Sequence, residues 1–218
     1  LTQLELSPVT IRHELGAVKS VLQWGMNFNH IPPVNLGAVK PPRMPLPKEK
    51  GMSIEAVKTM ISTAAKADPR LEPWLAVCYL AACRPSELPR LASKEGRFTA
   101  RTKDGGGVYA IEAKTTWQTG EPRHVILSPE AMIYFNSMKP HWENWESFSS
   151  RVRRPDVCGS GGPHPLRHSA MTHLLEAGVA REKADQVLGH NLPPRVSRTY
   201  GPIEWTALVS IAAKLTLR

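Results

Sequence analysis

Apolar positions near the start of the chain fall on one face of a helix. They recur at steps of three and four residues between Pro8 and His30, the period of an amphipathic helix. The stretch from Ile31 to Lys50 then holds six prolines among basic residues. This proline density prevents a helix and predicts a stiff, extended linker. One helix cannot bury its apolar face alone, so we expect residues 1–35 to end a helical domain whose other helices lie before residue 1. Residues 36–50 would be the linker, and 51–218 a second domain.

The pattern after the linker alternates between helical and β periods. Ser53 can cap a helix that carries Ile54 and Val57, and the apolar run 73–83 has the length of a buried helix. Between Arg97 and Leu127 the pattern changes to β, with a polar turn near residues 118–122. Helical patterns return from Ser128 to the end, interrupted by a glycine-rich loop that leads into a helix starting near His164. The sequence therefore predicts a mainly α fold with a small antiparallel β-sheet (α+β).

Charge adds a partner class to this picture. The 28 Lys and Arg outnumber the 19 Asp and Glu, which gives a net charge of +9. Such an excess suits a polyanion, because each phosphate that a protein neutralises releases counterions. Charge alone leaves DNA, RNA and anionic lipid open. The longest apolar run is far shorter than the roughly 20 residues of a membrane span, so no membrane partner is expected.

Cysteine usage and the first residues bear on the compartment. The three cysteines form no CxxC pair, which argues against a disulfide framework and a zinc finger. The chain begins with neither a basic leader nor an apolar signal segment. We expect a cytoplasmic protein.

Four fragments could carry chemistry, and each also has a plain structural explanation. His164, Arg167 and His168 share one face of a predicted helix whose positive N-terminus suits a phosphate. The structural explanation is that His164 caps the N-terminus of its own helix and Arg167 is solvated. Leu188-Gly189-His190 ends another helix. Arg84 and Glu87 could form a surface ion pair of little energetic value. Lys114 lies close to the predicted hairpin turn, where exposed lysines are common.

The order and separation of these fragments resemble the tyrosine recombinase (phage integrase) family. Arg84-x-x-Glu87 comes first, a hairpin lysine follows, then His164-x-x-Arg167, then Leu-Gly-His190 and a tyrosine near the C-terminus, Tyr200. The resemblance runs from about Ser53 to Trp205, and the helix around 10–24 resembles the last helix of the family's core-binding domain. It implies the tyrosine-recombinase catalytic-domain fold for residues 51–218.

The resemblance also implies a role for each residue. Tyr200 would attack a backbone phosphorus and form a 3′-phosphotyrosyl bond, while Arg84 and Arg167 hold the non-bridging oxygens. Lys114 would protonate the leaving 5′-oxygen; Lys103 is the alternative. His164 would assist proton transfer and His190 would bind a phosphate oxygen. Glu87 and His168 would orient these groups without reacting.

The implied chemistry requires no cofactor and no metal. His164 and His168 lie four residues apart and invite a zinc hypothesis, but a third ligand is missing and Arg167 would repel the cation. The implied partner is double-stranded DNA, in a bacterial or phage setting. The spacing from His190 to Tyr200 is ten residues, one more than is usual in the family.

Two other functions stay open at this stage, and the C-terminal tail suggests self-association. A type IB topoisomerase uses similar chemistry, and a DNA-binding protein could keep the fold without the activity. The helix–linker arrangement at the start favours a recombinase. The tail 203–218 is apolar on one side, so we expect it to dock on a neighbouring copy of the chain in a DNA-bound assembly. The family resemblance implies that this assembly is a tetramer. The alternative is that the tail packs on its own domain.

Overall fold

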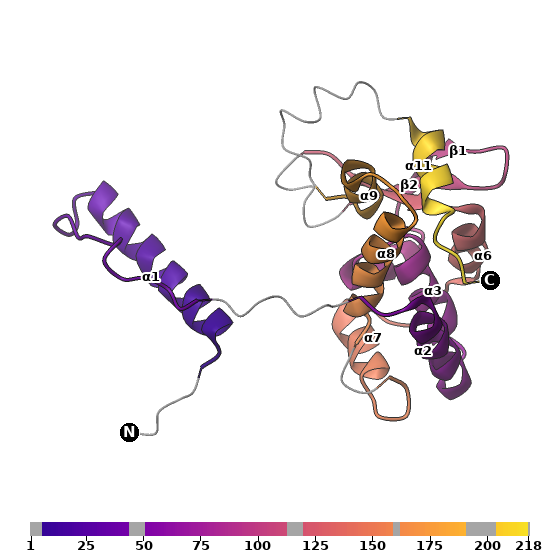
Figure 1. Ribbon diagram of the computed structural model, residues 1–218, viewed down its shortest axis with the longest axis horizontal. Helices are drawn as coiled ribbons and strands as arrows, with labels where there is room; N and C mark the ends of the chain where they lie inside the picture. Colours follow the sequence, from indigo (N-terminus) through magenta and orange to yellow (C-terminus); the bar gives the residue numbers. More distant parts are fainter. Residues whose placement is uncertain (1–5, 44–50, 113–119, 159–161, 191–203, 218) are drawn as a thin grey trace. The chain divides into compact units, whose positions relative to one another are not determined.

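The chain divides into two compact units, Leu1–Glu49 and Lys50–Arg218 (Figure 1). The computed structural model describes residues 6–43, 51–112, 120–158, 162–190 and 204–217.

In the first unit, residues 6–43 form one helix and the loop after it. Helix α1 spans Pro8–Asn27, and its N-cap Ser7 accepts a hydrogen bond from the amide of Thr10. Gly25 is the one buried residue of α1, and the apolar side chains of this helix are exposed or half-buried. Trp24 packs beside Phe28, with ring centroids 5.3 Å apart. The described part of the unit therefore leaves an apolar helix face uncovered.

The second unit is mainly helical with one small antiparallel sheet, as the sequence predicts. Its elements, in chain order, are α2 (Ile54–Ala67), α3 (Leu71–Leu80), the 3₁₀ turn η1 (Pro85–Glu87), α4 (Leu88–Ala92), β1 (Arg97–Arg101), β2 (Gly107–Ile111), β3 (Arg123–Leu127), α6 (Pro129–Ser137), α7 (Trp145–Val152), α8 (His164–Glu176), α9 (Arg181–Leu188) and α11 (Trp205–Ala212).

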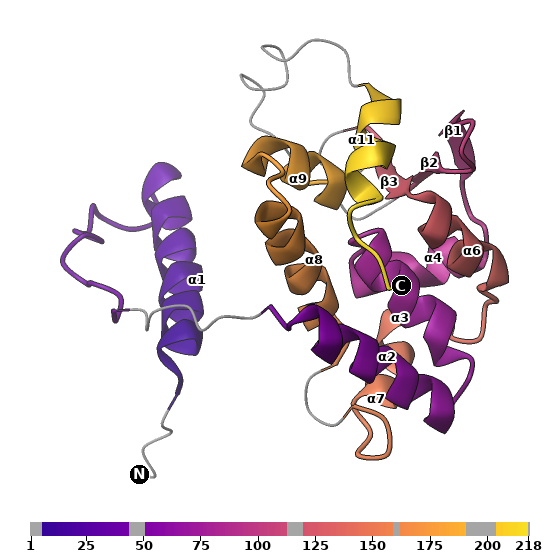
Figure 2. The ribbon, with the colours of Figure 1, turned by 45° about the vertical axis from the view of Figure 1, so that its right-hand side comes forward.

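Helix α3 forms the centre of this unit. Eight of its residues are buried, which explains why its sequence is apolar on every side. It contacts α2, α6 and α8 (Figure 2). At its start the indole of Trp74 donates to the carbonyl of Lys139 over 3.2 Å and packs edge-on against Trp142. The buried helix that the apolar run 73–83 predicts is thereby confirmed, with its last helical residue at Leu80.

The sheet has strand order β1-β2-β3, with both pairs antiparallel. Every residue of the central strand β2 is buried, and α11 contacts both β2 and β3. Since β3 also contacts α9, the sheet edge and the end of α9 lie together. This junction positions the candidate site.

The C-terminal helix α11 packs on its own unit. Leu208, Val209 and Leu215 are buried, and the Lys214 ammonium donates to the carbonyl of Ala177 over 2.9 Å. The carboxylate of Glu130 accepts hydrogen bonds from the last residues of the tail. Of the two arrangements considered from sequence, this chain has the one in which its own domain covers the tail.

Among the described residues, no helix is both long and apolar enough to span a bilayer.

Candidate active site

The end of helix α9 exposes two carbonyl groups toward the domain interior. Gly189 adopts a left-handed conformation, with φ at 67°, and ends the helix as a Schellman motif. The amide of His190 bonds to the carbonyl of Asp185, and that of Gly189 to the carbonyl of Gln186. The carbonyls of Val187 and Leu188 consequently need donors from elsewhere.

Two buried arginines supply those donors. Arg167, on α8, donates from Nη2 to the carbonyl oxygen of Leu188 over 2.8 Å. Arg123, the first residue of β3, donates to the same oxygen over 2.9 Å and to that of Val187 over 3.3 Å. Arg167 also bonds to the carbonyl of Ala82, two residues before Arg84. One guanidinium therefore joins the segment that precedes Arg84 to the segment that precedes His190.

Glu87 provides the negative charge for this cluster. Its side chain is 3% exposed and accepts hydrogen bonds from the backbone amide and from Nη1 of Arg84, both 2.9 Å long. Its Oε1 also lies 3.6 Å from Nε of Arg123. The Arg84–Glu87 pair is thus anchored in the core at the carboxylate end, while the arginine remains about one-third exposed. The pair is therefore not the fully exposed surface ion pair that the sequence also allowed for Arg84 and Glu87.

Burial and charge shift the pKa values of these groups in a consistent way. Burial opposes ionisation of Glu87, but the charges of Arg123, Arg167 and Arg84, with the Arg84 amide, outweigh it and lower its pKa. Burial lowers the pKa of Arg167 to about 10, offset in part by Glu87 and reinforced by Arg123 and Arg84. At neutral pH the cluster therefore holds one carboxylate and three guanidinium cations, an excess of positive charge that suits an anionic ligand.

The histidines lie around this cluster. His164 is the first residue of α8 and is exposed; its ring packs edge-on against His168, with centroids 4.8 Å apart. Arg167 lies on the same helix but points into the domain. The sequence predicts that His164, Arg167 and His168 share one face of the helix. In the structure the two histidines lie toward the surface and Arg167 lies inside the domain.

His190 follows the α9 cap and is held by a carboxylate. Its Nδ1 lies 2.7 Å from Oδ1 of Asp185. Because a carboxylate only accepts, Nδ1 carries the hydrogen and Nε2 faces away from that contact. The other oxygen of Asp185 accepts from Arg181 over 3.2 Å.

Two of the residues singled out from sequence, Lys114 and Tyr200, lie outside the described residues. Lys103, the alternative lysine, is an exposed residue of the β1–β2 turn. Two other tyrosines are buried with occupied hydroxyls: Tyr79 bonds to Nδ1 of His173, and Tyr109 donates to the carbonyl of Lys94, both over 2.8 Å. Neither can reach an external phosphate without unpacking the core.

Arg123 is the member of the cluster that the sequence pattern did not single out. It reads as an ordinary polar residue at the start of a strand. The available signal is its position: it opens a strand whose next apolar residues are all buried, so its side chain lies on the covered side of the sheet edge.

No group of three or more His, Cys, Asp or Glu side chains in the described ranges is arranged to hold a metal ion.

Comparison with known proteins extends the resemblance. No family model matches the sequence. The chain is 27% identical over 220 residues to tyrosine recombinase XerC 2 of Ralstonia nicotianae, an alignment that covers 84% of this chain and 59% of the relative. It is 27% identical over 170 residues to tyrosine recombinase XerA of Thermococcus kodakarensis, covering 70% and 58%. This chain therefore spans less than two-thirds of the length of these relatives.

The fold is similar to that of the integrase from mycobacterium phage Brujita. The TM-score is 0.55 at 16% identity, and the match covers 98% of this chain and 74% of the integrase. Sequence similarity and fold point the same way: the sequence is similar to tyrosine recombinases, and the fold is similar to that of a phage integrase.

Proposed function

We propose that the chain is the catalytic part of a site-specific DNA recombinase that breaks and rejoins DNA through a 3′-phosphotyrosyl intermediate. The observation that carries the proposal is the Arg167 guanidinium, which bonds to the carbonyls of Ala82 and Leu188. It joins three sequence motifs that are far apart in the chain, around Arg84, Arg167 and His190. A cluster with excess positive charge at one edge of a basic domain suits a phosphodiester.

Each proposed role follows from the chemistry of the residue. The phenol oxygen of Tyr200 would attack phosphorus, and the bond from phosphorus to the 5′-oxygen would break. The leaving 5′-oxygen would take a proton from Lys114, and His164 would assist removal of the phenol proton. The N–H groups of Arg84 and Arg167 that the protein leaves unused would stabilise the added negative charge. His190 in its imidazolium form, with Nδ1–H on Asp185, would donate from Nε2 to a phosphate oxygen.

Rejoining reverses these steps. The phosphotyrosyl bond retains the energy of the broken phosphodiester, so a DNA 5′-hydroxyl can displace Tyr200 without an external energy source. Glu87 would hold Arg84, and His168 would support His164 through their ring contact.

The test uses a nicked DNA duplex that carries the recombination site and traps the covalent complex. The chain should form a protein–DNA adduct on a denaturing gel in EDTA and without ATP, and Tyr200→Phe should abolish it. Tyr134→Phe is the matched control and should leave the adduct intact. An adduct that persists in Tyr200→Phe, or intact DNA binding without any adduct in the natural sequence, would contradict the proposal.

Partners and domain roles belong to the same proposal. Residues 1–35 would form the end of a core-binding domain, supported by the uncovered apolar face of α1.

The protein would bind double-stranded DNA in the cytoplasm of a bacterial or phage-infected cell and assemble on it as a tetramer. Tail residues 203–218 could make in a second copy the contacts that α11 makes here, as in domain swapping. Sedimentation of complexes on two-site DNA tests this, since one protomer per site without larger complexes would rule assembly out.

A further inference from the structure

A cavity of about 370 Å³ opens between η1, α7 and the start of α8, next to the candidate active site. Arg84 and His164 line one side of it, and Ser149 and Arg153 of the α7 region line another. No carboxylate lines this cavity among the described residues. Its electrostatic character is accordingly positive, and the N-terminal end of α8 adds to it.

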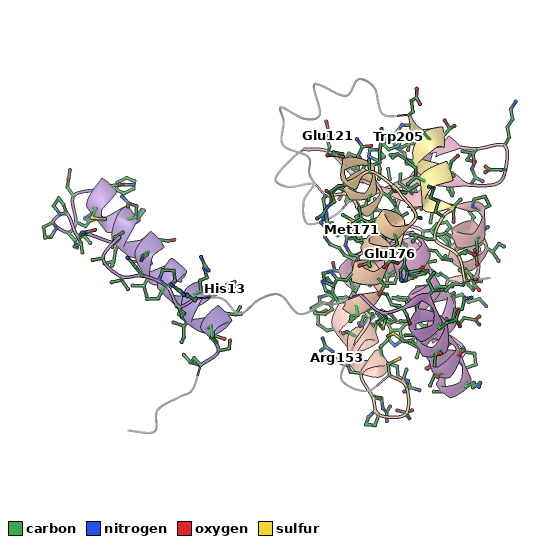
Figure 3. The ribbon with its side chains drawn as sticks, in the orientation of Figure 1. His13, Glu121, Arg153, Met171, Glu176 and Trp205 are labelled. Atoms are coloured by element: carbon green, nitrogen blue, oxygen red, sulfur yellow. The ribbon has the colours of Figure 1, made fainter. Side chains whose placement is uncertain are left out.

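Arg153 differs from the two arginines beside it. Arg151 is paired with Asp68 and Asp156, and Arg154 lies 3.8 Å from Asp156. In the part of the chain that the structure describes, the side chain of Arg153 has no hydrogen bond or ion pair, although it lines the cavity. Figure 3 labels it at the end of α7. Its charge is therefore available to a ligand.

A glycine allows Arg153 to lie against the start of α8. A Cβ on Gly162 would come within 3.0 Å of Nε of Arg153, tighter than ordinary contact, and Gly162 has a φ of 58°. Both features disfavour a larger residue at this position. The guanidinium consequently runs along bare backbone just before Pro163 and His164.

Ser149 supplies an independent indication of a ligand. The residue is 1% exposed, and its hydroxyl has no hydrogen-bond partner among the described residues. A buried polar group without a partner costs free energy, so such groups are usually satisfied by the protein, by water or by a ligand. This hydroxyl belongs to a side chain that lines the cavity.

The remaining wall is apolar and suits the sugar of a nucleotide. Trp145, Pro85 and Pro163 form most of it. Contacts to phosphate and sugar together position a protein on DNA without reading its sequence. A charged guanidinium, an unsatisfied hydroxyl and an apolar wall match one backbone unit of a DNA strand.

We propose that this cavity binds a second DNA backbone phosphate and its deoxyribose, adjacent to the phosphate that Arg84 contacts, with Arg153 and Ser149 as the positioning residues. The proposal rests on the proposed function in so far as the ligand is DNA. It adds Arg153 and Ser149, which lie outside the motifs that carry the family resemblance.

The test compares Arg153→Gln with Arg154→Gln in the full chain, binding a short mixed-sequence DNA duplex over a range of salt concentrations. One lost phosphate contact should reduce the slope of log affinity against log salt by about 0.9. We expect this reduction in Arg153→Gln and a near-unchanged slope in Arg154→Gln, because Arg154 does not line the cavity. Equal slopes in Arg153→Gln and the natural sequence, or equal reductions in both variants, would overturn the proposal.

Two further variants test the chemistry of the cavity. Arg153→Lys keeps the charge and should keep the slope, while its affinity falls because the planar fork is lost. Ser149→Ala should weaken binding about fivefold with the slope unchanged, as expected for one lost hydrogen bond. An unchanged dissociation constant in Ser149→Ala would show that the Ser149 hydroxyl does not bind the DNA.

Binding and cleavage separate this proposal from the function that it builds on. If the natural sequence binds DNA with the Arg153 signature but forms no covalent adduct, the recombinase proposal fails and the phosphate site stands. If the adduct forms while Arg153→Gln binds like the natural sequence, the reverse holds. Matching melting temperatures for all variants would exclude loss of folding as the cause.

Discussion

Arg123 and Arg167 donate to one carbonyl oxygen, that of Leu188, from 2.9 and 2.8 Å. Two cations at one acceptor are tolerable because Glu87 lies beside them, 3.6 Å from Arg123. The helix end contributes as well, since its last carbonyls carry partial negative charge. The site is therefore one electrostatic unit in which each arginine depends on the carboxylate and on the end of α9.

Removing the carboxylate should destabilise the whole domain. Glu87→Gln leaves three arginines without their buried counter-ion, and breaking a buried ion pair from one side typically costs about 3–5 kcal/mol. We expect a fall of about 3 kcal/mol in the free energy of unfolding, measured with urea. Glu95→Gln, at an exposed position, should stay within about 0.5 kcal/mol. A similar small change in both variants would show that the cluster does not need Glu87.

Two glycines allow the role of the α9 end to be isolated. Gly189 and Gly178 have φ values of 67° and 74°, and each ends a helix in the same hydrogen-bonding motif. Alanine at either position incurs left-handed strain of about 1–2 kcal/mol. A Cβ at 189 would in addition overlap the guanidinium of Arg123, whereas a Cβ at 178 meets nothing within 4 Å.

Gly189→Ala should accordingly destabilise the protein more than Gly178→Ala does, and it alone should impair adduct formation. Urea unfolding and the nicked-duplex assay measure the two effects. Equal losses of stability, with adduct formation retained in both variants, would mean that Arg123 moves aside without consequence.

The carboxylate behind His190 should matter for cleavage and not for affinity. Asp185→Asn replaces a pure acceptor with an amide that can also donate, so the hydrogen on Nδ1 and the ring orientation are no longer fixed. We expect the rate of adduct formation to fall about tenfold or more, with DNA affinity within about twofold, because His190 then loses the carboxylate that favours its doubly protonated, phosphate-donating form.

Arg181→Gln is the matched control for that variant. It removes the other partner of Asp185, an exposed pair one helical turn apart that contributes little. Cleavage should remain near the natural rate. If Arg181→Gln slows cleavage as much as Asp185→Asn, the effect comes from the charge of Asp185 on α9 and not from His190.

Asp68 should make the domain sensitive to acid. Hydrogen bonds from the Arg70 guanidinium, opposed by burial and aided by the Arg70 amide and Arg151, lower its pKa from 3.8 to about 2. A carboxyl with a lowered folded-state pKa contributes stability above its unfolded pKa, and that contribution is lost as the pH falls from about 4 to about 2.

The expected contribution of Asp68 is about 2 kcal/mol at neutral pH. Asp68→Asn should be destabilised near pH 7 and should lose less stability than the natural sequence between pH 4 and pH 2. Thermal unfolding across this range measures both. Parallel stability curves for the two proteins would contradict the assignment.

The sequence by itself determined the elements, because their signals are local. Ser53 caps α2 and accepts from the amide of Ala56, as its place before an apolar repeat indicates. The sequence also predicts the buried helix α3, because a helix that is buried on all sides is apolar throughout. It predicts the end of α9 at Leu188-Gly189-His190, because glycine favours the left-handed conformation that ends a helix. The ordered motifs also indicated the family.

Only the tertiary structure decided which charged side chains of these elements meet in one cluster. Arg123 carries no local mark, and its place in the cluster depends on β3 lying against the end of α9. The tail's docking on its own unit likewise depends on surfaces of β2, β3 and α9 that the local pattern cannot place. Arg167 turns inward from a helix that shows two histidines to the surface, because the carbonyls it must satisfy belong to segments 85 and 21 residues away. Such long-range pairing is set by packing, which no local sequence pattern encodes.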